Sequence, residues 1–171
     1  MPTYSKETIT SLIEGKLPWT TTKQIMSEQK DPDRFEKILE IHQDRVPWSD
    51  TIVLCMGEHL YIVRKRVNGD WGFMVKCECG FEFCEYSRNW KMEALMYVRD
   101  TEEKLEEIMP APHIADPEWG VIREYYCPGC KTQLEVEALP PGYPVIFDFL
   151  PDIDGFYEMY PDLKKKLFKE G

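Results

Sequence analysis

The chain has 171 residues, 43% of them apolar and 13% aromatic, a composition that excludes wholesale disorder and allows one domain with a sizeable core. Its 31 acidic and 21 basic residues give a net charge of −10, which argues against nucleic-acid binding, because that binding depends on Lys and Arg at phosphates. The sequence has no apolar run of the ~18 residues that a membrane helix needs and no apolar signal-peptide core, so we predict a cytoplasmic protein without membrane contact.

Positions 1–50 are predicted to form a polar, helical N-terminal arm. Ser5 can cap a first short helix, which Gly15 would end. A later helix is predicted to begin with Asp31 as its N-cap and Pro32 at its first position. Its apolar stripe consists of Phe35, Ile38, Leu39 and Ile41. That stripe needs a partner surface, which is either the core of this domain or another subunit.

Positions 51–139 are predicted to form an α+β domain built on an antiparallel sheet. Strand-like runs surround Asn68-Gly69, a strong signal for a two-residue hairpin, and the second of them ends at Cys77. Further elements are expected as a helix over 101–108, capped by Thr101, and as strands over 119–126 and 132–139.

Positions 140–171 are predicted to form an extended C-terminal arm. Prolines at 140, 141, 144, 151 and 161 prevent a regular β-ladder. The aromatic residues between them are Tyr143, Phe147, Phe149, Phe156, Tyr157 and Tyr160. So many aromatic side chains would be poorly placed in solvent, so the arm is expected to lie on a surface, either of its own domain or of a partner chain.

Four of the six cysteines occur as two short turns, Cys77-Glu78-Cys79-Gly80 and Cys127-Pro128-Gly129-Cys130. Zinc (Zn2+) prefers four tetrahedral ligands, and thiolates are typical of its structural sites. Gly80 and Gly129 are expected to supply the positive φ that such turns use. Each turn lies between strand-like runs, as in zinc ribbons, so we predict one zinc ion held by Cys77, Cys79, Cys127 and Cys130.

Other interpretations of the cysteines stay open at this point. A Cys-x-x-Cys pair also serves redox chemistry, and the thiols could form a disulfide or remain free. Cys84 could replace one ligand, whereas Cys55 is typical of a small core residue. A site with four protein ligands has no open position for catalysis, and the sequence contains no phosphate loop or nucleophile elbow. We therefore predict no catalytic residue in this chain.

Several segments resemble the gamma subunit of acetone carboxylase, and a related small subunit occurs in acetophenone carboxylase. The segments that carry the resemblance are Asp31–Phe35, Pro47-Trp48, Val75–Gly80, Phe83-Cys84, Asn89–Lys91, Val98–Thr101, Val121–Pro128, Glu135–Ala138, Gly142–Phe149 and Pro151–Tyr157. They span nearly the whole chain.

The resemblance implies a complex of two alpha, two beta and two gamma subunits that carboxylates a ketone with bicarbonate and ATP. It places ATP and manganese (Mn2+) in the large subunits and makes the small subunit a zinc-binding, non-catalytic component. Which ketone is used is not evident from this chain. Two alternatives remain: a zinc-ribbon module that binds protein or nucleic acid, and a stand-alone zinc or thiol enzyme.

Overall fold

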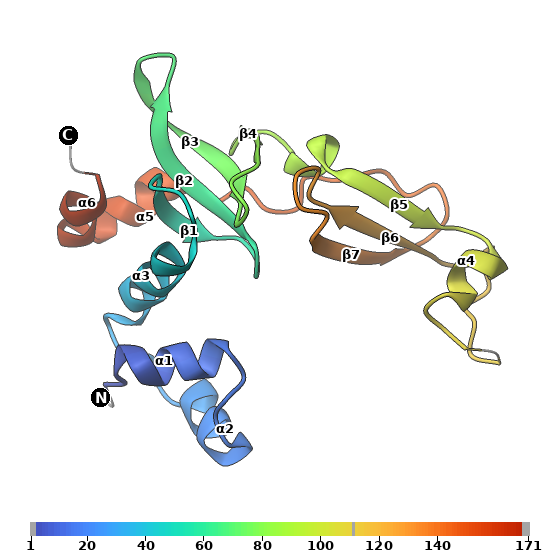
Figure 1. Ribbon diagram of the computed structural model, residues 1–171, viewed down its shortest axis with the longest axis horizontal. Coiled ribbons are helices and arrows are strands. Elements are labelled where there is room, and N and C mark those ends of the chain that lie inside the picture. Colours follow the sequence, from blue (N-terminus) through green and yellow to red (C-terminus); the bar gives the residue numbers. More distant parts are fainter. Residues whose placement is uncertain (1–2, 111, 169–171) are drawn as a thin grey trace.

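The computed structural model describes residues 3–110 and 112–168, and its strands form two separate antiparallel sheets. The large sheet has the strand order β1-β2-β3-β4 and consists of β1 (Thr51–Cys55), β2 (Leu60–Val67), β3 (Asp70–Cys77) and β4 (Glu82–Glu85). The small sheet has the order β5-β6-β7 and consists of β5 (Leu95–Arg99), β6 (Val121–Tyr126) and β7 (Gln133–Leu139). The sheets lie side by side along the long axis (Figure 1). The α+β class is confirmed, with two sheets in place of the one predicted.

The hairpin between β2 and β3 sets the register of the large sheet. Asn68 and Gly69 have φ angles of 53° and 97°, the positive values that a two-residue turn of this kind requires. The pairing then runs without a shift along both strands and ends with Leu60 opposite Cys77. Because a shift of one residue would turn every β3 side chain to the other face, this turn determines the face on which Cys77 lies.

Three helices occupy the N-terminal segment: α1 (Lys6–Ile13), α2 (Trp19–Ser27) and α3 (Arg34–Arg45). Ser5 caps α1 as predicted, because its side chain accepts the backbone N–H of Thr8 at 3.2 Å. The predicted start of α3 at Asp31 is wrong. Asp31 is buried and accepts hydrogen bonds from Arg34 Nε at 2.7 Å and from Lys37 Nζ at 3.2 Å. Burial alone would raise the pKa of Asp31, but these cations lower it to about 2.

The apolar stripe of α3 packs on the large sheet. Leu39 is buried in one cluster with Ile52, Tyr61 and Val63, and α3 lies beside β1 in Figure 1. The sequence left open whether this stripe packs on the chain's own core or on another subunit. In the structure it packs on the chain's own core. Among the residues described, no helix is both long and apolar enough to span a bilayer.

The C-terminal segment differs from the extended arm predicted for 140–171. Residues 140–152 contain no helix or strand and cross from the small sheet to the large one, where α5 (Ile153–Met159) and α6 (Pro161–Leu167) follow (Figure 1). The Asp152 side chain caps α5 by accepting the N–H of Gly155 at 3.0 Å, and proline is favourable as the first residue of α6. The ends of the two predicted arms, positions 1–2 and 169–171, lie outside the described residues.

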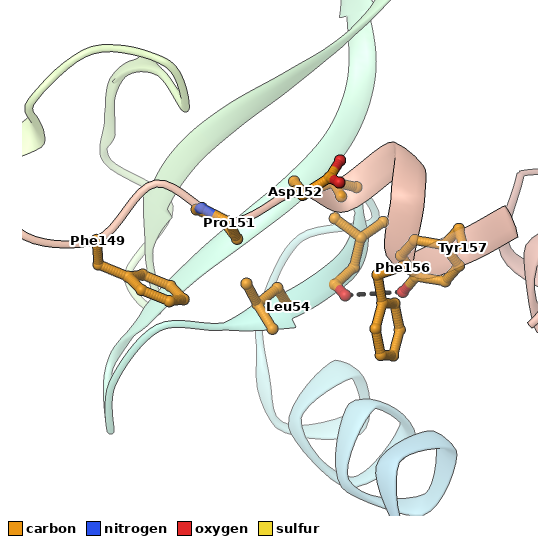
Figure 2. A pocket seen from close by; sticks show the side chains of 8 residues that line it. Leu54, Phe149, Pro151, Asp152, Phe156 and Tyr157 are labelled. Atoms are coloured by element: carbon orange, nitrogen blue, oxygen red, sulfur yellow. Dashed lines mark hydrogen bonds between the residues drawn. The ribbon is translucent and has the colours of Figure 1, made fainter. Parts of the chain in front are cut away.

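Figure 2 shows how this C-terminal segment lies against β1. The Tyr157 hydroxyl donates to the Val53 carbonyl oxygen at 2.7 Å, and both residues are buried in one cluster with Ile62 and Ile153. An apolar cavity of about 210 Å³, with Phe149 on its wall, remains beside this contact. The sequence left open whether the tail lies on its own domain or on a partner chain. Residues 153–157 pack on the chain's own domain.

Aromatic side chains pack where the two sheets meet. Phe83 on β4, Trp90 on the short helix η1 (Trp90–Glu93) and Tyr125 on β6 are buried in one cluster. Their rings form T-shaped pairs with centroids 5.7 Å and 6.0 Å apart, a favourable arrangement. At the other end of the small sheet, α4 (Glu102–Glu106) is capped by Thr101 as predicted but ends before residue 108.

Candidate metal centre

Four of the six cysteines lie together at the junction of the two sheets. Cys77 is the last residue of β3 and Cys79 follows in the next turn, while Cys127 and Cys130 lie between β6 and β7. Each pair therefore comes from a different sheet. All four sulfur atoms lie within 4.8 Å of one another. The structure thus brings together the four side chains that the sequence proposes as ligands.

The sulfur distances fit a tetrahedral metal ion. Cys77 Sγ lies 3.8 Å from Cys130 Sγ, and Cys79 Sγ lies 3.7 Å from Cys127 Sγ. A disulfide bond measures about 2.05 Å. Zinc bound by four thiolates at about 2.3 Å gives sulfur–sulfur edges of about 3.8 Å. Both of these short distances join one sheet to the other, so an ion held here would cross-link the sheets.

Gly80 and Trp48 shape the first cysteine turn. Gly80 has a φ of +99°, as predicted, and its N–H donates to the Cys77 carbonyl oxygen at 2.9 Å. The indole N–H of Trp48 donates to the Glu78 carbonyl oxygen at 2.9 Å. A Cβ at Gly80 would lie 3.2 Å from Cδ1 of Trp48. The turn therefore requires glycine both for its backbone conformation and for the contact with this indole.

In the second turn, the role predicted for Gly129 is wrong. Gly129 does not have a positive φ, and Lys131 adopts that conformation instead, with a φ of 65°. Close packing explains the glycine: a Cβ at Gly129 would lie 3.4 Å from Cys79 Sγ and 3.2 Å from Phe81 Cβ. Gly129 is thus the point where the two cysteine turns meet.

The four thiols have different surroundings. Cys77 and Cys127 are buried, whereas Cys79 and Cys130 are exposed. Burial raises the pKa of the Cys77 and Cys79 thiols. The Thr132 hydroxyl, 3.2 Å from Cys130 Sγ, lowers the pKa of the Cys130 thiol to about 6. Since a thiol binds metal as the thiolate, a cation would offset the cost of ionising the buried sulfurs. The donor set and its spacing fit zinc.

The other two cysteines lie outside this cluster. Cys84, considered above as a replacement ligand, is buried, and its thiol donates to the Arg88 carbonyl oxygen at 3.5 Å. Cys55 belongs to β1, where burial raises the pKa of its thiol to about 12. Cys84 is buried and Cys55 half-buried, and neither sulfur lies among the four clustered ones, so neither residue is a candidate ligand in this arrangement.

A second group of close carboxylates already surrounds a cation. Oxygens of Glu135, Glu137 and Asp148 lie within 4.8 Å of one another. Lys91 Nζ lies 2.7 Å, 2.7 Å and 3.1 Å from these carboxylates, and its side chain is fully buried. Burial alone would lower the pKa of Lys91, but the carboxylates raise it, so the ammonium stays charged. This network ties residue 148 of the crossing segment to the small sheet.

The sequence did not identify Trp48, Thr132 or Lys91 as parts of this region. Trp48 and Lys91 occur in segments that carry the family resemblance, which is a signal of importance but not of role. Their partners lie far away in the sequence, so spacing alone could not assign them.

Comparisons with known proteins identify the family of this chain. The family model described as acetone carboxylase gamma subunit matches residues 46–161, which include all four clustered cysteines. The acetone carboxylase gamma subunit of Xanthobacter autotrophicus is 48% identical over 155 residues, which cover 91% of this chain and 91% of that protein. The acetophenone carboxylase beta subunit of Aromatoleum aromaticum is 34% identical over 79 residues, 45% of this chain and 61% of that protein. Because the family model matches more than half of the chain and the Xanthobacter protein matches 91% of it, the protein belongs to the acetone carboxylase gamma subunit family.

Proposed function

We propose that this chain is a small, zinc-binding, non-catalytic structural subunit of an ATP-dependent ketone carboxylase that converts acetone and bicarbonate to acetoacetate. The observation that carries the proposal is the group of four sulfurs within 4.8 Å of one another, two pairs of them 3.8 Å and 3.7 Å apart, in a chain of this family. Cys77, Cys79, Cys127 and Cys130 would fill every position of the ion, so it would not activate water or a ketone. Its contribution would be to hold the two sheets together.

The proposed partners are the large alpha and beta subunits, in a cytoplasmic hetero-hexamer with two copies of each chain. ATP and Mn2+ would bind to the large subunits. Neither of the two candidate ligand clusters within the described residues suggests a catalytic centre. A lysine lies among the carboxylates of one, and the four thiols of the other would leave a metal no open position. We propose residues 51–139 as the metal-binding part, with 1–50 and 140–171 as flanking arms.

The test combines metal content with assembly. The chain, co-expressed with the large subunits of its carboxylase, should contain about one zinc per copy by plasma mass spectrometry. Cys130→Ser should lose the zinc, whereas the control Cys55→Ala should keep it. ATP-dependent carboxylation of acetone should require the large subunits and be absent from the chain alone. A purified complex that lacks zinc in this chain, or turnover by the chain alone, would contradict the proposal.

A further inference from the structure

The end of the small sheet that points away from the cysteines carries a concentrated negative charge. We define the acidic tip as residues 100–110 and 112–120, the connection from β5 to β6 that includes α4. Positions 100–120 hold seven acidic residues and one lysine, a charge of −6 out of the chain's −10. Since β6 starts after this connection and ends at Tyr126, just before Cys127, the acidic tip lies at the opposite end of β6 from the cysteine cluster (Figure 1).

The acidic tip presents Trp119 to solvent. Trp119 is 81% exposed, which is the largest exposure among the large hydrophobic side chains of the described residues. Exposed tryptophans are unfavourable in an isolated protein and are strongly enriched among residues that dominate binding at interfaces. Exposure by itself does not identify a site, but it makes the Trp119 side chain available to a partner.

A tight turn holds Trp119 in place. Its N–H donates to the Asp116 carbonyl oxygen at 3.0 Å, and the Gly120 N–H donates to the same oxygen at 3.1 Å. The Asp116 side chain accepts the N–H of Glu118 at 2.9 Å. Because these bonds order the backbone before binding, a partner would not have to supply that ordering.

The base of the acidic tip is also well packed. Leu105 is fully buried, Arg99 donates to the Lys104 carbonyl oxygen at 2.8 Å, and Arg99 pairs with Glu107. Beside Trp119, a groove of about 360 Å³ runs along apolar residues such as Met109. The acidic tip is thus a structured segment of charge −6 that presents an exposed tryptophan with an apolar groove next to it.

The charge of this surface decides between possible occupants. A second copy of the chain would bring two tips of charge −6 together, and nucleic acid or anionic lipid would be repelled in the same way. A protein surface with an apolar pocket and a rim of lysine or arginine is complementary in both respects. We propose that the acidic tip docks through Trp119 into such a basic-rimmed apolar pocket on a large subunit of the carboxylase. This inference rests on the proposed function, which supplies the large subunits.

The test measures binding of the full-length chain to the large subunits of its own carboxylase, expressed as a complex without this chain. Biolayer interferometry at low and high NaCl should show weaker binding of the wild type at high salt, as expected for opposite charges. Trp119→Ala should weaken binding at least about tenfold, a typical loss for an interface hot spot. The matched control is Trp19→Ala, because Trp19 is 74% exposed but lies in α2, outside the acidic tip. It should change affinity less than about threefold.

A charge variant tests the second half of the proposal. Glu102→Gln, Glu103→Gln and Glu106→Gln, combined, remove three exposed carboxylates without touching the Arg99 contacts, and they should flatten the salt dependence. If the wild type binds but Trp119→Ala and the charge variant bind equally well, the docking proposal is wrong and the proposed function stands. If the wild type does not bind the large subunits at all, the proposed function itself is wrong. Self-association by sedimentation that Trp119→Ala abolishes would assign the acidic tip to a second copy and overturn the proposal.

Discussion

The large and small sheets are stabilised in different ways. Every strand of the large sheet buries apolar side chains, and α3 and α5 pack against it. On the strands of the small sheet, Val121 and Tyr125 are the buried apolar residues among the described positions, whereas Arg99, Arg123 and Glu124 are buried charged residues. The large sheet also buries Arg64 and Lys76, but its buried side chains are mainly apolar, whereas on the small sheet buried charged residues outnumber the apolar ones.

This difference is consistent with the structural role that we propose for the cysteine cluster. A three-stranded sheet with few buried apolar side chains cannot offset the entropy of ordering its chain by packing alone. Small folds of this kind commonly use a structural metal, which binds only the assembled site and so adds its binding free energy to folding. The two sheets should therefore respond separately to mutation and to acid, and loss of the metal should have the largest effect.

Loss of the metal should affect the small sheet far more than the large one. Cys127→Ser leaves three sulfurs from the two turns and should destabilise the small sheet by more than about 4 kcal/mol, the range associated with loss of a metal site. Hydrogen exchange should accelerate in β6 and β7 and stay slow in β2. The control Cys55→Ala should leave both sheets protected. Equal protection in Cys127→Ser and wild type would show that the cysteine cluster does not stabilise this sheet.

Removal of the buried lysine should give the next largest effect, again in the small sheet. Lys91→Ala leaves Glu135, Glu137 and Asp148 close together without a cation, which should cost about 3 kcal/mol in the free energy of unfolding. As a control, Arg88→Ala breaks an ion pair with Glu93 whose arginine side chain is 65% exposed, and it should cost less than about 1 kcal/mol. Urea unfolding measures both. Similar losses in the two variants would mean that burial of the lysine is unimportant.

Acid should destabilise the small sheet and the α2–α3 connection at different pH values. If the four cysteines hold a metal as proposed, falling pH would protonate the thiolates and release it, so the small sheet should lose protection first. The pKa of Asp31 is about 2, below the ~3.9 of an unfolded aspartate. Its stabilisation of the α2–α3 connection is therefore complete above about pH 4 and is lost as the pH falls towards about 2.

Hydrogen exchange as a function of pH should thus show two steps, with β6 and β7 exchanging at higher pH than residues 31–37. Asp31→Asn should remove the second step and leave the first unchanged. A single step that includes both regions would contradict the separation of the two sheets.

The smallest expected effect concerns the C-terminal segment on the large sheet. Tyr157→Phe removes the hydrogen bond to the Val53 carbonyl oxygen and leaves the ring in place, so it should cost about 1 kcal/mol. Thermal unfolding measures the loss, and exchange in β1 should rise while that in β6 does not. Tyr160→Phe serves as the control because Tyr160 is 49% exposed. If Tyr157→Phe raises hydrogen exchange in β6 as much as in β1, the two sheets are coupled more tightly than proposed.

Features that depend on neighbouring residues were predictable from the sequence. The Asn68-Gly69 hairpin and the caps Ser5 and Thr101 occur where expected, because positive φ and capping hydrogen bonds are decided within a few residues. The family resemblance and the choice of four candidate cysteines also came from short local patterns, because the two cysteines of each pair lie in a single turn.

The tertiary structure decided which distant surfaces meet, and those contacts assigned the remaining roles. Gly129 matters for its approach to Cys79, Asp31 for burial between two cations, and Lys91 for carboxylates on another strand and on the crossing segment. The prolines of the C-terminal segment suggested an extended arm, yet Asp152 caps a helix whose Tyr157 is buried against β1. Local patterns do not specify a partner far away in the chain. The sequence by itself therefore determined the Asn68-Gly69 hairpin, two helix caps and the choice of candidate cysteines, and only folding determined that the two cysteine turns come from different sheets.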